Sequence, residues 1–192
     1  MSLTPSNMLP LGTQAPAFNL PDVTTDGMKS LEQLQGETAT VVMFICNHCP
    51  YVKHIFDELV RLGNDYKNRG IGLVAISAND VDSHPEDRPD KMRELAEQIG
   101  LPFPYLYDQS QAVARAYDAA CTPDFYVFDA DMKLAYRGQL DGSRPGNNTP
   151  NDGHDLRAAI DALLDGKQPA DEQTPSTGCN IKWREEPVHR LD

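Results

Sequence analysis

The sequence lacks any apolar run of the roughly 20 residues that a membrane-spanning helix needs. Its first segment, residues 1–8, contains no lysine or arginine and no apolar core, so it does not match a secretory signal. Basic residues are scarce: 17 lysines and arginines stand against 29 aspartates and glutamates, for a net charge of −12. Such an acidic chain repels phosphate backbones and anionic lipid surfaces. We therefore expect a cytoplasmic protein that binds neither nucleic acid nor a membrane.

The remaining composition is that of an ordinary globular domain. Apolar residues make up 40% of the chain and charged residues 24%, which excludes wholesale disorder. A chain of 192 residues buries about 70% of its unfolded surface, so it needs neither disulfides nor a structural metal in order to fold. Its four cysteines are therefore available for chemistry. In a reducing compartment a Cys-x-x-Cys pair is typical of redox-active or metal-binding sites.

Hydrophobic patterning predicts strands that alternate with helices. Residues 38–45 and 71–77 are apolar and rich in β-branched side chains, as expected for strands that are buried on both faces. Further strands are expected at residues 105–107, 125–129 and 134–138, a single helical turn after Ser30, and helices at residues 50–70, 87–99, 109–117 and 154–164. This order predicts an α/β fold with a mixed sheet. We divide the chain into an N-terminal arm (1–10), one domain (11–166) and a C-terminal extension (167–192).

The C-terminal extension is rich in proline and charge, yet it contains the segment Cys179-Asn-Ile-Lys-Trp183 with the only tryptophan. A disordered tail has little use for cysteine, isoleucine and tryptophan together, so we expect this segment to dock on the domain. No regular element is predicted around Cys179. The acidic residues Asp87 and Asp90 are expected to lie on a solvated face.

The segment Cys46-Asn-His-Cys-Pro50 joins a predicted buried strand to a predicted helix. Proline is favourable at the first helical position, which puts Cys49 at the helix N-terminus. Unpaired backbone N–H groups there favour a thiolate, and such cysteines have pKa values of roughly 3.5–7.5. Cys49 is therefore the candidate nucleophile. For Cys46, a reactive thiol and an ordinary buried residue both remain open.

Several motifs resemble the peroxiredoxin and redoxin branch of the thioredoxin-fold superfamily. They are Gly12-Thr-Gln-Ala-Pro-Ala-Phe18, the Val41-Val-Met-Phe44 strand, Cys49-Pro50, and Cys121-Thr-Pro-Asp-Phe-Tyr-Val-Phe-Asp129. With the terminal Gly178-Cys-Asn-Ile-Lys-Trp183, the resemblance covers about residues 10–183 and extends to the peroxiredoxin-like group of bacterial thioredoxin-fold proteins. It implies a mixed central sheet flanked by helices, with an N-terminal β extension and a docked C-terminal tail.

The resemblance also implies a register. Cys49, rather than Cys46, takes the place of the nucleophilic cysteine of thioredoxin, and Val52 stands where the second cysteine would be. Against peroxiredoxins, Cys49-Pro50 matches the peroxidatic cysteine and its proline. However, Val42 replaces the proline of the peroxiredoxin motif and Cys46 replaces its threonine. Pro123 stands where the peroxide-binding arginine is expected, so the hydrogen bonds that polarise a peroxide are not all provided.

The resemblance further implies a cis peptide bond between Thr122 and Pro123, which would place the Thr122 backbone beside Cys49 and its substrate. Cys121 precedes this loop and could resolve an oxidised Cys49, bind a metal or simply be buried. Cys179 could resolve Cys49 through a disulfide between tail and site, or pack as a buried thiol. An imidazolium at His48 would stabilise a nearby thiolate, but a solvated loop histidine is an equal alternative.

Three functions follow from these residues. The first is a thiol-dependent oxidoreductase that needs no cofactor: Cys49 attacks a disulfide or peroxide, Cys46, Cys121 or Cys179 forms an internal disulfide, and a thioredoxin-like dithiol regenerates the protein. The second is copper or zinc binding by Cys46, His48, Cys49 and Cys121, in a fold similar to the copper chaperones of cytochrome oxidase. The third is a non-catalytic binding module. A homodimer is one of the assemblies left open.

Overall fold

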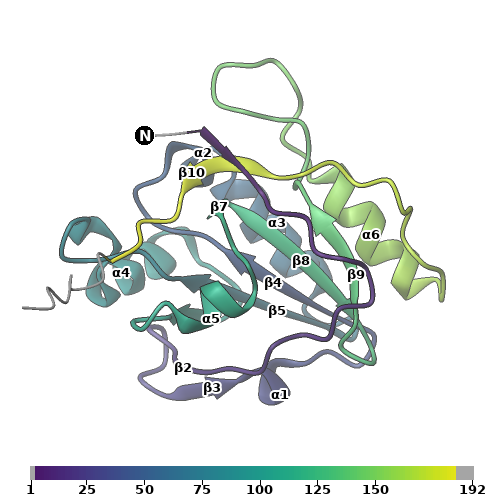
Figure 1. Cartoon of the computed structure of the whole chain (residues 1–192), viewed down its shortest axis with the longest axis horizontal. Helices are drawn as coiled ribbons and strands as arrows, with labels where there is room; N and C mark the ends of the chain where they lie inside the picture. Colours follow the sequence, from purple (N-terminus) through teal and green to yellow (C-terminus); the bar gives the residue numbers. More distant parts are fainter. Residues whose placement is uncertain (1–2, 185–192) are drawn as a thin grey trace, which may run out of the picture.

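The computed structural model describes residues 3–184 and builds them around a five-stranded mixed sheet (Figure 1). Its strands, from edge to edge, are β6 (Tyr105–Tyr107), β5 (Ile71–Ser77), β4 (Ala39–Phe44), β8 (Asp124–Asp129) and β9 (Leu134–Gly138). Strand β5 runs parallel to β4 and β6, whereas β8 runs antiparallel to β4 and β9. The predicted α/β class and mixed sheet are confirmed.

The central strand β4 is buried along its whole length because both faces of the sheet are covered. Val41 and Met43 belong to one hydrophobic cluster, and Val42 and Phe44 belong to the other, as the alternation of side chains along a strand requires. The first cluster is covered by α3 (Phe56–Tyr66), α4 (Pro89–Ile99) and α6 (His154–Leu164). The second is covered by α1 (Leu31–Leu34), α5 (Ala112–Ala116) and the hairpin of β2 (Asn19–Pro21) and β3 (Met28–Ser30).

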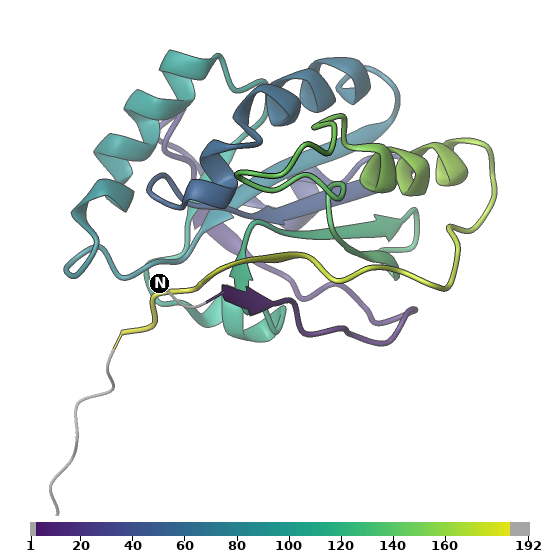
Figure 2. The same ribbon diagram turned by 90° about the horizontal axis from the view of Figure 1, so that it is seen from above.

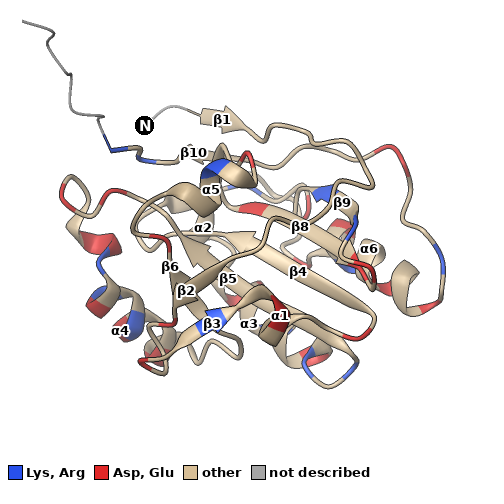
Figure 3. Cartoon of the chain, turned by 60° about the horizontal axis from the view of Figure 1, so that its bottom comes forward, with Lys and Arg blue, Asp and Glu red and all other residues tan. Residues whose placement is uncertain are grey.

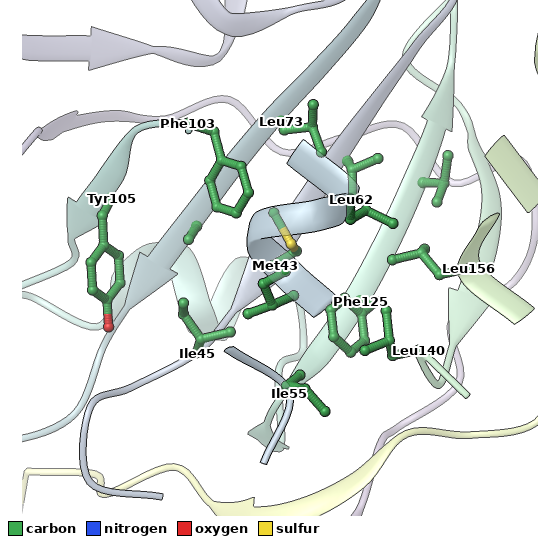
Figure 4. Packing of buried hydrophobic residues seen from close by; sticks show 14 of the residues in the cluster. Met43, Ile45, Ile55, Leu62, Leu73, Phe103, Tyr105, Phe125, Leu140 and Leu156 are labelled. Carbon is green, nitrogen blue, oxygen red and sulfur yellow. The ribbon is translucent and has the colours of Figure 1, made fainter. Parts of the chain in front are cut away.

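Figure 2 shows these layers edge on, with α3, α4 and α6 on one side of the sheet. Figure 4 shows residues of the first cluster, in which Met43 lies between Ile45 on one side and Leu62 and Phe125 on the other. Each side chain buried fully in this way contributes on the order of 1.5–3 kcal/mol. This packing fixes the end of β4, and therefore fixes the point at which Cys46 and Cys49 emerge from the sheet.

Two predicted helix boundaries are confirmed by their caps. The Ser30 hydroxyl accepts a hydrogen bond from the Gln33 backbone N–H, and the Gln33 side chain accepts one from the Ser30 N–H, which forms a capping box at α1. Helix α4 ends at Gly100, whose φ of +66° places it in the left-handed region that glycine tolerates best.

The helix predicted after Pro50 is divided into α2 (Pro50–Lys53) and α3 (Phe56–Tyr66). The division falls at His54 and Ile55, where the His54 carbonyl accepts a hydrogen bond from Asn151 Nδ2 at 2.8 Å. In a continuous helix this carbonyl would accept a hydrogen bond from a backbone N–H one turn later. Here it accepts one from the side chain of a distant loop residue instead, which accounts for the interruption of the helix.

A second, three-stranded sheet joins the two ends of the described chain. Strand β10 (Thr177–Asn180) pairs antiparallel with β1 (Leu3–Pro5) on one side and with β7 (Cys121–Thr122) on the other. The expected docking of the C-terminal extension is confirmed, whereas the expectation of no regular element around Cys179 is wrong. The strand was not recognised because it is only four residues long and pairs with segments far away in the sequence. The predicted extension also includes residues 185–192, which lie outside the described residues.

Charged side chains are absent from β4 and β5 and are carried mainly by helices and loops (Figure 3). None of the helices within residues 3–184 has the length and apolar character needed to cross a membrane. The cytoplasmic location stays a prediction.

Candidate active site

The nucleophile predicted from the sequence, Cys49, is the N-cap residue of α2, and Pro50 occupies the first helical position. The Cys49 carbonyl accepts hydrogen bonds from the N–H groups of Val52 (3.1 Å) and Lys53 (3.0 Å), which fixes the first turn. The Cys49 side chain is fully buried. The local sequence therefore places this thiol where a buried strand meets a helix start, as expected.

The loop that precedes β8 lies against both thiols of the Cys46–Cys49 segment. The peptide bond between Thr122 and Pro123 is cis, which confirms the expectation. Cys49 Sγ lies 3.3 Å from the Thr122 carbonyl oxygen, and Cys46 Sγ lies 3.4 Å from Thr122 Oγ1. Thr122 is therefore in contact with both sulfurs, and its role in substrate binding stays a prediction.

Cys179 is a direct thiol neighbour of Cys49. Strand β10 places Cys179 opposite Thr122 in the register with β7, and Cys179 Sγ lies 2.8 Å from Cys49 Sγ. No disulfide bond joins any of the four cysteines, all of which lie within the described residues. The two sulfurs are thus in direct contact in the reduced state.

Hydrogen bonding favours the charged form of Cys49. The Cys46 thiol has the largest influence and, together with hydrogen bonds from Cys179, the Val52 N–H and Thr122, lowers the pKa of Cys49 from 9.0 to about 5 against the opposing effect of burial. For Cys179, burial and the hydrogen bond to Cys49 raise the pKa to about 12. The pair therefore shares one proton at neutral pH, with the negative charge on Cys49 and the proton on Cys179.

Cys46 is a hydrogen-bond donor in this arrangement. Its bond to Cys49, its burial and the charge of Asp87 all raise the pKa of Cys46 well above its ordinary value. A thiol that keeps its proton can donate to the Cys49 thiolate, but it is a weak nucleophile itself. Of the two alternatives that the sequence left open for Cys46, the geometry favours a buried, non-attacking residue that acts on Cys49.

His48 is directed toward Asp87. Its Nδ1 lies 2.5 Å from Asp87 Oδ2, and its ring stacks on His84 with the ring centroids 4.8 Å apart. The Asp87 carboxylate also accepts hydrogen bonds from the backbone N–H groups of Asn47 and His48 and from Asn79 Nδ2. Burial alone would raise the pKa of Asp87, but these hydrogen bonds hold it below its ordinary value.

The sequence-based placement of Asp87 on a solvated face is wrong. Asp87 is fully buried and accepts hydrogen bonds from the backbone N–H groups of Asn47 and His48 in the loop between Cys46 and Cys49. It lies at the end of a 3₁₀ turn, Pro85–Asp87, that precedes α4. Nothing in the run His84-Pro-Glu-Asp-Arg-Pro89 distinguishes a buried carboxylate from an exposed one.

The proposed metal ligands do not all come together. Among the described residues, the donor atoms that lie within 4.8 Å of one another belong to Cys46, His48 and Asp87, and Cys49 and Cys121 are not in this group. Asp87 already accepts hydrogen bonds from the backbone N–H groups of Asn47 and His48, from the His48 ring and from Asn79 Nδ2. This donor set is therefore occupied by its own internal contacts and does not favour copper or zinc.

Cys121 lies in β7, one residue before the Thr122 backbone that contacts Cys49. Its Sγ is directed to the Pro123 carbonyl oxygen at 3.6 Å, and burial raises the pKa of Cys121 far above its ordinary value. Of its three predicted alternatives, the geometry supports the simple buried thiol.

Comparisons with known proteins place the chain among redox proteins of one family. The model of the AhpC/TSA family matches residues 11–137. The crystal structure of an uncharacterized conserved protein from Geobacillus kaustophilus is 56% identical, with a TM-score of 0.95 over 97% of this chain and 98% of that one. The chain is also similar to curated proteins with redox names. The thiol-disulfide oxidoreductase ResA of Bacillus thuringiensis is 24% identical over 65% of this chain. MT2597 of Mycobacterium tuberculosis, which its name classes with the peroxiredoxins, is 30% identical over 61% of this chain and 69% of its own length. The match spans 66% of the length of ResA, which is just under two thirds.

Proposed function

The chain belongs to the AhpC/TSA family of peroxiredoxin-like, thioredoxin-fold oxidoreductases, and within that family we propose that Cys49 is the nucleophile and Cys179 its resolving partner. The observation that carries this proposal is the 2.8 Å contact between Cys49 Sγ and Cys179 Sγ, with the thiolate on Cys49. Two sulfurs in contact can form a disulfide after a small rotation of their side chains.

With a disulfide R–S–S–R′ as substrate, the Cys49 thiolate attacks one sulfur and forms a mixed disulfide, and R′–S⁻ leaves. Cys179 then attacks the Cys49 sulfur of the mixed disulfide, loses its proton, and releases R–S⁻. The product is an internal Cys49–Cys179 disulfide. A dithiol reductant returns both residues to thiols and is itself oxidised to a disulfide.

With a peroxide ROOH as substrate, the Cys49 thiolate attacks the terminal oxygen, and the leaving alkoxide takes up a proton to give ROH. The resulting sulfenic acid condenses with the Cys179 thiol, which gives the same internal disulfide and one water. Because Cys46 and Pro123 stand where the peroxiredoxin hydroxyl and arginine are expected, we favour a disulfide substrate over a peroxide.

The order of the two steps follows from the shared proton. Burial raises the pKa of Cys179 most, and the hydrogen bond and charge of the Cys49 thiolate raise it further. Once Cys49 is part of a mixed disulfide, the hydrogen bond and the charge are lost, so Cys179 ionises more easily than before. The first step thus makes the resolving thiol more reactive.

Peptide-mapping mass spectrometry after a short oxidant pulse tests the proposal. The reduced protein is exposed for seconds to a micromolar small disulfide or to hydrogen peroxide, quenched with acid, and digested. A Cys49–Cys179 disulfide as the first product supports the proposal. A disulfide between Cys49 and Cys46 or Cys121 would contradict the assignment of Cys179, and oxidation no faster than that of free cysteine would contradict the nucleophilic role of Cys49.

A further inference from the structure

Strand β10 occupies the edge of β7 directly beside the reacting sulfur. Cys179 pairs with Thr122 and Asn180 pairs with Cys121, so the main chain of β10 uses the edge next to Cys49. Gly178 makes this approach possible, because a Cβ atom at that position would overlap the Thr122 carbonyl oxygen. Figure 1 shows β10 lying between β1 and β7, and Figure 2 shows it running along one side of the central sheet.

Contacts on both sides of Cys179 hold this strand in place. Before it, Ser176 Oγ donates to the Pro123 carbonyl at 2.6 Å, and the Ser6 N–H donates to the Ser176 carbonyl at 2.8 Å. After it, the Ile181 N–H donates to the Ala120 carbonyl at 3.1 Å, and the Ile181 side chain is buried in the second hydrophobic cluster. Lifting β10 therefore breaks several hydrogen bonds and exposes an apolar side chain to water.

A polypeptide that presents a cysteine in extended form to Cys49 needs the same edge. Such a chain binds by adding a strand to a free sheet edge, with its main chain hydrogen-bonded to the existing strand. Here β10 already forms that pairing, and its own Cys179 stands where the incoming sulfur would have to be. A molecule of a few atoms requires only that the Cys179 side chain move aside.

We propose that β10 occupies the edge of β7 to which an extended polypeptide would otherwise bind. By doing so, it makes Cys49 selective for small oxidants over the disulfides of polypeptides. The inference rests on the proposed function, since it assigns the substrate class of the same thiol. Selectivity arises because a small oxidant leaves the strand in place, whereas a polypeptide must displace it.

The test compares two activated mixed disulfides that carry the same chromogenic leaving thiol. One is made with N-acetylcysteine, and the other with a ten-residue extended peptide that has a central cysteine. Both react with full-length Cys179→Ser protein, in which β10 stays but the adduct on Cys49 is not resolved. The readout is the ratio of the peptide rate constant to the small-molecule rate constant, divided by the same ratio for free cysteine. Mass spectrometry verifies that the adduct is on Cys49. We expect a normalised ratio at least tenfold below one.

A second variant, Gly178→Ala in the Cys179→Ser background, adds the methyl group that Thr122 cannot accommodate and displaces β10. We expect the normalised ratio to rise at least tenfold, with the small-molecule rate unchanged or higher. Gly27→Ala is the matched control, because the closest atom to a Cβ at Gly27 is Thr25 Oγ1 at an ordinary 3.7 Å. If Gly178→Ala does not fold, Ser176→Ala removes the hydrogen bond to Pro123 and should raise the ratio by a smaller factor.

The outcomes separate the two proposals. If Cys49 reacts with neither probe faster than free cysteine does, the proposed function fails. If it reacts readily with both and the normalised ratio is near one, the proposed function stands and the selectivity of β10 is overturned. A low ratio that neither Gly178→Ala nor Ser176→Ala changes also overturns it, because the exclusion then has another source.

Discussion

Two buried negative charges, on Cys49 and on Asp124, lie on either side of the cis peptide bond of Thr122 and Pro123. Each is stabilised by a different kind of partner. On the Thr122 side, the Cys49 thiolate accepts hydrogen bonds from neutral groups, chiefly the Cys46 thiol, the Cys179 thiol and the Val52 N–H. On the other side, Asp124 is paired with the guanidinium of Arg137, and both side chains are fully buried. Each group is covered by one end of the chain: β10 lies over Cys49, and Ser6, next to β1, donates to Asp124 at 2.8 Å.

The difference shows that the partner of a buried charge decides whether that charge supports a reaction or stabilises the fold. Neutral donors lower the pKa of Cys49 without neutralising its charge, so the electron pair stays available for attack. Arg137 neutralises Asp124 and in addition stacks over the Tyr126 ring at 4.5 Å, so that charge has no reactive role. The first region should therefore control activity, and the second should control the free energy of unfolding.

The largest effect is expected for Cys49→Ser. Turnover of a small disulfide with a dithiol reductant should fall to the rate without protein, because a serine hydroxyl does not ionise near neutral pH. Cys121→Ala is the matched control, since Cys121 is a buried thiol in β7, one residue before the Thr122 backbone that contacts Cys49, and this variant should retain activity. Loss of activity in both variants would mean that the two thiols act together, and the distinction drawn between them would be wrong.

The next effect concerns the other region. Arg137→Met leaves Asp124 buried without its partner and should lower the free energy of unfolding by about 3–5 kcal/mol in urea titrations. The folded fraction should keep the Cys49 reactivity of the unchanged protein. Asp124→Asn combined with Arg137→Met should recover most of the loss, because no charge is then left buried. If the double variant is as unstable as the single one, packing rather than charge explains the effect.

The variant Cys46→Ala tests whether a neutral hydrogen-bond donor stabilises the Cys49 thiolate. Removing the principal hydrogen-bond donor should move the pKa of Cys49 from about 5 toward its ordinary value of 9.0. The rate of reaction with a small thiol-specific methylating reagent, measured from pH 4 to pH 9, reports this shift as a later inflection. Cys121→Ala should leave the inflection in place. An unchanged inflection in Cys46→Ala would show that Cys46 does not stabilise the thiolate.

The pH dependence of stability should carry the signature of Asp124. Burial raises the pKa of Asp124 to about 6 despite the opposing charge of Arg137, above the ordinary value of 3.8. Between these values the folded protein holds more protons than the unfolded chain. This stabilising contribution is therefore present below about pH 4 and is lost as the pH rises through 6. Urea titrations at pH 4 and pH 6.5 should show a smaller difference between the two pH values for Asp124→Asn. An equal difference would assign the dependence to other groups.

The smallest effects are expected from the two serines that hold the terminal segments. Ser6→Ala and Ser176→Ala should each cost about 1–2 kcal/mol in the free energy of unfolding, because each leaves a buried acceptor without its donor. They should differ at Cys49: Ser176→Ala loosens β10 and should raise the reaction rate of Cys49 with an activated disulfide of an extended peptide a few-fold, whereas Ser6→Ala should not. Equal rates in the two variants would argue against local control by β10.

Local sequence patterns predicted the position of Cys49 between a buried strand and a helix. A buried strand, a cysteine, a proline and a helix follow one another within a few residues, so the place of Cys49 could be read directly. The cis bond at Pro123 and the docked tail came from the resemblance together with unusual composition, and both are confirmed.

The missing part depends on contacts between distant segments. The Cys49–Cys179 contact joins residues that are 130 positions apart, and the four residues of β10 are too few for a periodic signal. Asp87 is buried because Asn47, His48 and Asn79 surround its carboxylate, which no property of its neighbours in the sequence indicates. The roles of the site residues in catalysis remain predictions.

Cys49 and strand β10, which covers it, are far apart in the sequence, and this separation also matters during synthesis on the ribosome. At about 5–20 residues per second, Cys179 is made roughly 6–26 s after Cys49. During this interval the helix that contains Cys49 can form while the edge of β7 has no partner strand. A nascent chain whose Cys49 is not yet covered by β10 can attack the disulfides of small cellular molecules and release one of their thiols, and the mixed disulfides formed at this stage would mark chains that have not completed folding.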